Sequence, residues 1–158
     1  DSVATFNKLL DLFFNDELVS VMTFGKGRFK SKQVELLRYC SKQKIQIVGG
    51  PSKLLNYYIK NYNPTKIISY SSNDISSGNV YEQLGFQFVS ETKYSYWYIK
   101  KNKLIRYNRQ KFMKNKLSSI FPEYFDNNKT EFEIMNNTGK FYRIFDSGQK
   151  KFEKILNK

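Results

Sequence analysis

Histidine is absent from this sequence of 158 residues, and cysteine occurs only once. Without an imidazole, the chain cannot build a Ser-His-Asp or Cys-His catalytic set, a histidine-dependent nuclease site or a histidine-containing zinc site. The single cysteine, Cys40, cannot form an internal disulfide, and its neighbours carry no signature of a catalytic nucleophile. We expect Cys40 to be a reduced thiol on a half-buried strand, and we expect no metal site.

Long hydrophobic runs are missing as well. No apolar stretch approaches the roughly 20 residues that a transmembrane helix needs, so the sequence predicts a soluble domain with no membrane partner. The chain starts Asp1-Ser2-Val3, with neither an initiator methionine nor a basic and apolar leader. This start is typical of a trimmed product or an excised fragment rather than of a signal peptide.

Acidic residues are outnumbered: 27 Lys and Arg face 14 Asp and Glu, which gives a net charge of +13. A field of this sign attracts phosphate polyanions and makes association depend steeply on salt. A solubility surface in a Lys- and Asn-rich chain has the same composition. Composition alone therefore does not separate nucleic-acid binding from a solvated face.

The hydrophobic pattern predicts an α/β fold. Two apolar runs flank Asn15-Asp16, residues that tolerate the backbone of a tight turn, so a β-hairpin followed by a basic loop is expected. Strands and helices then alternate, which indicates a mixed, partly parallel sheet flanked by helices. The expected strands are 5–14, 18–24, 34–39, 45–48, 66–70, 86–89 and 94–99, and the expected helices are 52–62 and 79–84.

We place the core in residues 1–100 and a basic C-terminal extension, packed on that core, in residues 101–158. The extension contains a helix start with the capping-box pattern at Thr130 and Glu133, and a strand at 141–145. No internal repeat is present.

A glycine turn at Gly49-Gly50 leads into the helix that begins near Ser52 and Lys53. Backbone N–H groups at a helix start attract anions such as phosphate, because the helix dipole and the unpaired donors act together. An ordinary strand-to-helix turn has the same sequence. Both interpretations stay open at this point.

The segment Val80-Tyr81-Glu82-Gln83-Leu84-Gly85-Phe86 resembles the Tyr-Glu-x-Leu-Gly-Phe signature of GNAT acyltransferases, and it lies about 30 residues after the glycine turn. The resemblance implies that a splayed pair of strands admits the pantetheine arm of acyl-CoA and that Tyr81 protonates the leaving thiolate. It also implies a cofactor-binding set for the pyrophosphate: Gly49, Gly50, Ser52, Lys53 and Asn79. Pro51 departs from the family's glycine turn and removes one amide donor.

A second resemblance extends over residues 17–150. The segments 17–25, 35–40, 48–54, 68–70, 77–81 and 142–148 are similar to the domain that ends many phage-encoded homing-endonuclease-like proteins, and to the Mom family of phage DNA-modifying proteins. This kinship implies nucleic acid as the partner, DNA rather than RNA. It also implies an upstream nuclease domain or a larger phage complex, and the cytoplasm of the host cell as the location.

Five residues are the catalytic candidates under these resemblances: Tyr81, Tyr70, Ser69, Asp74 and Glu35. The family shows Ser-Tyr-Ala-Asp where this chain has Ser69-Tyr70-Ser71-Ser72, so Asp74 is the nearby replacement for the missing carboxylate. Glu35 is either an orienting or base carboxylate or the partner of a neighbouring lysine. Since Glu35 and Arg38 are three apart on one expected strand, we expect them on opposite faces.

Residues 93–116 contain nine basic residues and no acidic one, interleaved with tyrosines, a tryptophan and a phenylalanine. Cations beside aromatic rings are the residue types that single-stranded or flipped-base binding requires. For Tyr96 and Tyr98 we prefer packing in the core. The nucleic-acid candidates are Arg28, Lys30, Lys32, Arg38, Lys100, Lys101, Lys103, Arg106, Arg109 and Lys111.

Two functional hypotheses result. The first is a nucleic-acid-binding GNAT-like domain of a phage mobile-element or DNA-modification protein, with no certain cofactor. The alternative is an active N-acyltransferase that uses acyl-CoA and modifies a DNA base or another amine. A nuclease in its own right is disfavoured, because histidine and a paired-acid metal site are both absent from the pattern.

Overall fold

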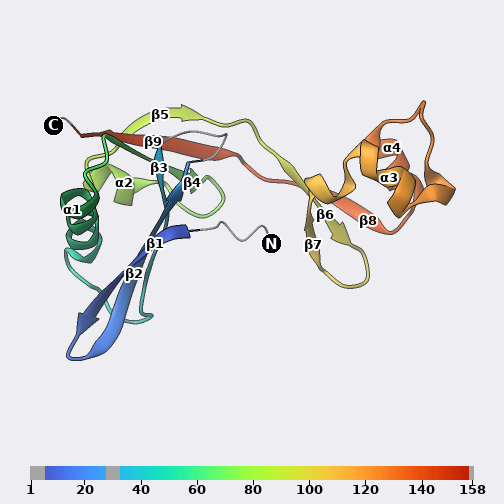
Figure 1. Ribbon diagram of the computed structural model, residues 1–158. Helices are drawn as coiled ribbons and strands as arrows, with labels where there is room; N and C mark the ends of the chain where they lie inside the picture. Colours follow the sequence, from blue (N-terminus) through green and yellow to red (C-terminus); the bar gives the residue numbers. More distant parts are fainter. Residues whose placement is uncertain (1–5, 28–32, 157–158) are drawn as a thin grey trace. The chain divides into compact units, whose positions relative to one another are not determined.

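The computed structural model describes residues 6–27 and 33–156, which form two compact units (Figure 1). The larger, here called the core unit, comprises Ser2–Thr92 and Gln149–Lys158. The smaller, here called the basic unit, comprises Lys93–Gly148 and is inserted between two neighbouring antiparallel strands, β5 (Gln87–Glu91) and β9 (Gln149–Ile155). Residues 149–155, expected in the C-terminal extension, thus form a strand of the core sheet.

The core unit contains one six-stranded sheet with the order β1-β2-β3-β4-β9-β5. The pair β3–β4 is parallel, whereas the other four pairs are antiparallel, so the sheet is mixed as the sequence predicted. The first four strands are β1 (Phe6–Phe14), β2 (Glu17–Lys26), β3 (Val34–Ser41) and β4 (Lys66–Ser72).

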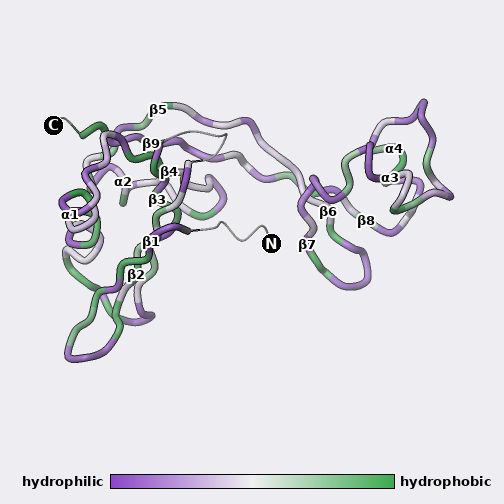
Figure 2. Tube along the Cα trace, viewed as in Figure 1, coloured by the Kyte–Doolittle hydropathy of each residue, from purple (hydrophilic) through white to green (hydrophobic). Residues whose placement is uncertain are grey.

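The expected hairpin is confirmed. Asn15 and Asp16 have φ values of 50° and 60°, the left-handed conformation that lets a two-residue turn follow the twist of its strands. Figure 2 shows this turn as hydrophilic between strands rich in hydrophobic positions. The basic loop expected over 25–32 begins later, since β2 continues to Lys26, and residues 28–32 lie outside the described part.

Helices α1 (Gly50–Tyr62) and α2 (Asn79–Gln83) agree with the two expected helices. Leu54 and Leu55 of α1 belong to one buried cluster with Ile67 of β4 and Phe152 of β9, and Tyr81 of α2 packs against the same cluster. Both helices therefore cover the same face of the core sheet (Figure 1).

Two local expectations were wrong. Residues 45–48 form turns rather than a strand, and Ile45 and Val48 are exposed because no strand pairs with this segment. Cys40 lies on a strand as expected, but the residue is exposed rather than half-buried.

The basic unit has its own three-stranded antiparallel sheet, with the order β7-β6-β8, and its own aromatic core around Tyr98 and Phe112. Its strands are β6 (Tyr96–Lys100), β7 (Arg106–Asn108) and β8 (Phe141–Phe145), and its helices are η1 (Arg109–Phe112), α3 (Lys114–Ile120), η2 (Pro122–Tyr124) and α4 (Glu131–Asn137). The predicted capping box starts α4, since Thr130 and Glu133 each accept a hydrogen bond from the other's backbone N–H. Within the described ranges, no helix is long and apolar enough to span a bilayer.

Candidate functional site

The strands β3 and β4 form a fork. They pair in parallel at only two positions, Val34 with Ile67 and Glu35 with Ile68, although β3 continues to Ser41 and β4 to Ser72. Beyond Glu35 the backbone groups that face the neighbouring strand are no longer joined by the ladder. A parallel pair that opens in this way can admit an extended ligand between its strands.

Ser69 closes the base of the fork. Its hydroxyl is fully buried and donates a hydrogen bond of 2.8 Å to the carbonyl oxygen of Leu36. Leu36 and Ser69 each come directly after the last ladder pair, Glu35 with Ile68. The hydrogen bond from the Ser69 side chain therefore takes the place of the next backbone bond that a continuing ladder would form. Ser69 therefore has a structural role at the point of divergence, whatever else it does.

A β-bulge lies beside the fork. Thr23 of β2 is opposite Arg38 and Phe24 is opposite Leu36, so Leu37 of β3 has no partner in this ladder. Bulges disrupt the ladder locally and recur next to active sites. The bulge also corrects an expectation: Arg38 and Glu35 lie opposite Thr23 and Gly25, which are two apart, so the register places both on one face rather than on opposite faces.

The sheet separates four of the five catalytic candidates. Ser69 lies opposite Phe152 of β9, and the ring of Tyr81 stacks on Phe152 with 5.1 Å between centroids, so Ser69 and Tyr81 belong to the helix-covered face. Tyr70 follows Ser69 and points to the other face. Glu35, which is 1% exposed, shares that other face because it pairs with Ile68, two residues before Tyr70.

The face of Tyr70 and Glu35 also carries a charged cluster. Glu153 pairs with Lys66 at 2.5 Å and with Lys151 at 2.7 Å, and Lys151 lies opposite Tyr70. Burial raises the pKa of Glu153, but the hydrogen bonds from Lys151 and Lys66 outweigh burial, so the net shift is downward. The Glu153 carboxylate consequently stays ionised at neutral pH.

The glycine turn offers few donors to an anion. Gly50 N–H donates to the Ile47 carbonyl, Pro51 has no N–H, and Lys53 N–H donates to the Gly49 carbonyl. Of the backbone N–H groups of residues 50–53, all of which lie in the described part of the chain, only that of Ser52 lacks an acceptor. Gly49 has a φ of 72°, and a Cβ there would meet no atom within 4 Å, so the turn is open on that side.

Tyr81 is held by aromatic packing in α2. Its ring contacts Phe86 edge-on at 5.8 Å in addition to Phe152, and it is half-buried. Gly78 precedes α2 with a φ of 90°, and a Cβ at this position would come within 2.5 Å of Phe152. The glycine thus allows α2 to approach β9 and places Tyr81 against the sheet, while Asn79 at the helix start is exposed.

Asp74 lies in the loop that follows β4, at the carboxyl end of that strand, where ligand sites of open α/β sheets gather. It lines a polar cavity of about 340 Å³ together with Asn73, Ser76, Ser77 and Lys150. The structure shows Asp74 exposed beyond the end of the strand, so its role as a replacement carboxylate stays a prediction.

The nucleic-acid candidates fall into three groups. Arg28, Lys30 and Lys32 lie outside the described residues, and Arg38 is exposed in the core unit. The remaining six lie in the basic unit, and four of them sit over aromatic rings. These pairs are Arg106 over Trp97 at 4.0 Å, Lys101 over Tyr142 at 4.7 Å, Lys111 over Tyr107 at 4.7 Å and Arg109 over Tyr96 at 5.3 Å.

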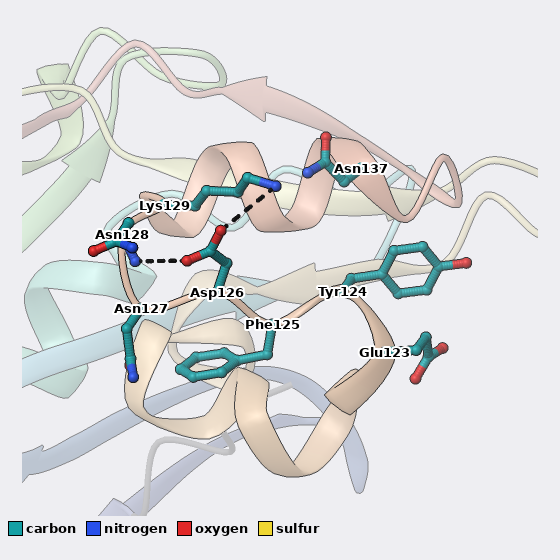
Figure 3. Close-up of a pocket in the computed structure, with 8 residues that line it drawn as sticks. All are labelled: Glu123, Tyr124, Phe125, Asp126, Asn127, Asn128, Lys129 and Asn137. Carbon is teal, nitrogen blue, oxygen red and sulfur yellow. Dashed lines mark hydrogen bonds and ion pairs between the residues drawn. The ribbon is translucent and has the colours of Figure 1, made fainter.

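The basic unit also holds a polar cavity of about 630 Å³ between η2 and α4 (Figure 3). Its charged groups are largely satisfied by one another: Asp126 accepts a hydrogen bond from the Asn128 N–H and lies 3.8 Å from the Lys129 ammonium. Figure 3 shows Glu123 and Tyr124 directed away from these groups. We therefore do not place a site in this cavity.

Comparison with known proteins identifies the fold. No family model and no curated protein matches the chain. Among solved structures, it is similar to a Bacillus subtilis acetyltransferase in complex with CoA, with 16% identity and a TM-score of 0.53 over 94% of this chain and 76% of that one. A GNAT family acetyltransferase from Elizabethkingia anophelis with acetyl-CoA bound gives 17% identity and a TM-score of 0.52 over 94% and 75% of the two chains.

The chain thus has the mixed α/β fold of GNAT acetyltransferases, as the resemblance around Tyr81 implied. The comparisons give no support to the finer resemblance to phage homing-endonuclease-like and Mom proteins, which stays a prediction.

Proposed function

We propose that this chain is a GNAT-type N-acyltransferase that uses acyl-CoA and transfers the acyl group to an amine. The observation that carries the proposal is the fork between β3 and β4, with the Leu37 bulge beside it, in a fold shared with acetyltransferases that hold CoA. The sequence alone favours a nucleic-acid-binding module. The fold comparisons support its alternative, the transferase, better.

The residues present fit acyl-CoA in part. The open side of Gly49, the Ser52 N–H without an acceptor and the exposed Lys53 side chain would hold the phosphates, with fewer backbone donors than an unmodified glycine turn supplies. The fork would take the extended arm. When bound, acyl-CoA supplies the acyl group, whose C–S bond breaks as a C–N bond forms to the acceptor.

Tyr81 is the residue that we assign to proton donation. Its hydroxyl belongs to a ring fixed by Phe152 and Phe86 on the helix-covered face, the face to which Ser69 also belongs. A positioned general acid contributes on the order of 10² to 10⁴ in rate. Glu35 lies on the other face, so Asp74 is the carboxylate that we propose to orient the acceptor or receive its proton. A DNA base is one acceptor that the predicted kinship suggests.

The test measures both binding and transfer. CoA and acetyl-CoA are titrated calorimetrically, and acyl transfer is followed by release of free thiol and by mass analysis with polyamines, nucleosides and DNA as acceptors. We expect Tyr81→Phe to bind acetyl-CoA as the wild type does and to lose about 10² or more in rate. Tyr57→Phe, which removes a hydroxyl from an exposed position of α1, is the matched control and should keep full activity. Absence of both CoA binding and transfer in the wild type would refute the proposal.

A further inference from the structure

A second cavity of the basic unit, of about 300 Å³, lies between α4 and β8. Its walls are mainly aromatic and include Phe132 of α4 together with Phe141 and Phe145 of β8. Cavities of roughly 300 Å³ are at the small end of ligand sites, which is enough for one flat ring system but not for a large cofactor.

Arg143 is the charged group of this cavity. Its guanidinium carbon lies 4.0 Å from the centroid of the Phe132 ring and 5.0 Å from that of Phe145. The Nε atom is buried, and in the described ranges it has no hydrogen-bond partner. A buried donor without an acceptor is costly, because it has given up its bond to water.

The stacking leaves those donors available. Cation–π contacts use the face of the guanidinium, whereas its N–H groups lie in its plane and can still make a bidentate pair with an oxyanion. Glu131 is close, but one of its oxygens accepts hydrogen bonds from both Tyr96 and Tyr98, and no ion pair joins it to Arg143 within the described residues. Arg143 therefore lacks an anionic partner among the residues that the structure describes.

The net charge of the basic unit favours a polyanion as the anionic partner of Arg143. The 56 residues of Lys93–Gly148 contain twelve Lys and Arg and five Asp and Glu, so this unit carries +7 of the chain's +13. An isolated aromatic acid would pair with Arg143 but would gain little from the other cations. A strand of nucleic acid presents flat bases for the aromatic walls and regularly spaced phosphates for the cations.

We infer that the cavity between α4 and β8 binds one nucleotide unit of single-stranded nucleic acid, with its phosphate on Arg143 and its base against Phe132 or Phe145. This inference is independent of the proposed acyl transfer, because it rests on contacts within the basic unit alone. The basic residues of this unit, which the sequence already marks as nucleic-acid candidates, would hold the flanking phosphates.

Fluorescence anisotropy with labelled 12-nucleotide oligo(dT) and the full chain provides the test. Base stacking and a bidentate phosphate pair each contribute enough that Arg143→Lys and Phe132→Leu should each weaken binding at least fivefold. Lys60→Gln removes one exposed charge from α1 of the core unit and should change the affinity less than twofold. Thermal melts of each variant verify that it is folded.

Two further measurements keep the outcome decisive even if a variant does not fold. Ultraviolet cross-linking of oligo(dT) to the wild type should label peptides that contain residues 132 or 141–145, and labelling confined to other peptides would overturn the inference. Thymidine monophosphate as competitor distinguishes a free nucleotide from a strand, since only a strand engages the flanking cations. Equal displacement by polyglutamate, or unchanged affinity in both cavity variants, would show a nonspecific cationic surface instead.

Discussion

Replacement of Gly78 by alanine should destabilise the core unit through two separate effects. The residue has a φ of 90°, and a left-handed conformation costs an L-residue about 1–2 kcal/mol. The new Cβ would also come within 2.5 Å of Cζ and 2.8 Å of Cε2 of Phe152, a ring that is 1% exposed and stacked on Tyr81. Overpacking of a closed core costs about 1–3 kcal/mol, so the total is about 2–5 kcal/mol.

Gly49→Ala is the matched control, because Gly49 has a φ of 72° but a Cβ at this position would meet no atom within 4 Å. It should therefore cost only the conformational part, about 1–2 kcal/mol. The assay is urea unfolding followed by far-UV circular dichroism, with the fluorescence of Trp97, the single tryptophan, reporting on the basic unit. If the two variants lost the same free energy of unfolding within about 0.5 kcal/mol, the close approach of Gly78 to Phe152 would be refuted.

Three further predictions concern the basic unit. Thr130→Ala removes the N-cap of α4 and should lower the free energy of unfolding by about 0.5–2 kcal/mol in urea titrations followed by Trp97 fluorescence. Burial raises the pKa of Asp146, but hydrogen bonds from the Ser95 and Gly148 amides and from Trp97, with the charge of Arg106, outweigh burial and lower it from 3.8. Asp146 therefore contributes stability above about pH 4 that is lost as the pH falls through its lowered pKa, and Asp146→Asn should flatten urea-unfolding stability in that acidic range. The last prediction replaces four cations by glutamine: Lys100, Lys101, Lys103 and Arg106. The slope of log affinity for oligo(dT) against log salt should then fall by up to about 3, and an unchanged slope would show that these side chains do not contact phosphate.

Local chemistry explains which elements the sequence could predict. The turn at Asn15-Asp16 and the capping box at Thr130 depend on the residues within a few positions, and both were confirmed. The seven residues of β9 read as a polar tail, because one of its faces carries Lys151 and Glu153. Its pairing partners, β4 and β5, lie far away in the sequence, so only the folded sheet reveals β9 as a strand between them.

The arrangement of the candidate site was harder to predict than its residue types. A one-residue bulge at Leu37 changes which side chains of β3 share a face, and nothing in the segment Glu35-Leu36-Leu37-Arg38 marks the extra residue. The sequence marks the fork more clearly than the bulge, because Ser69 is a small hydroxyl residue within a run of hydrophobic strand residues. The resemblances make Ser69 a catalytic candidate, whereas the structure shows its hydroxyl bonded to the Leu36 carbonyl oxygen.

The separation of the candidates by the sheet limits the chemistry that they can share. Tyr81 and Ser69 belong to the face covered by α1 and α2, whereas Glu35 and Tyr70 belong to the other face, where Lys66, Lys151 and Glu153 form an ion cluster. A proton that leaves the acceptor and a proton that reaches the leaving thiolate need groups that meet at one reacting centre. The opening between β3 and β4 is the place in this arrangement where a ligand passing through the sheet would contact both faces. If the acyl group lies in that opening, Tyr81 can donate its proton from one side, and Glu35 can act only from the other side. A loss of acyl transfer in Glu35→Gln, a variant that keeps Tyr81, would therefore locate the reaction within the fork rather than above the helix-covered face.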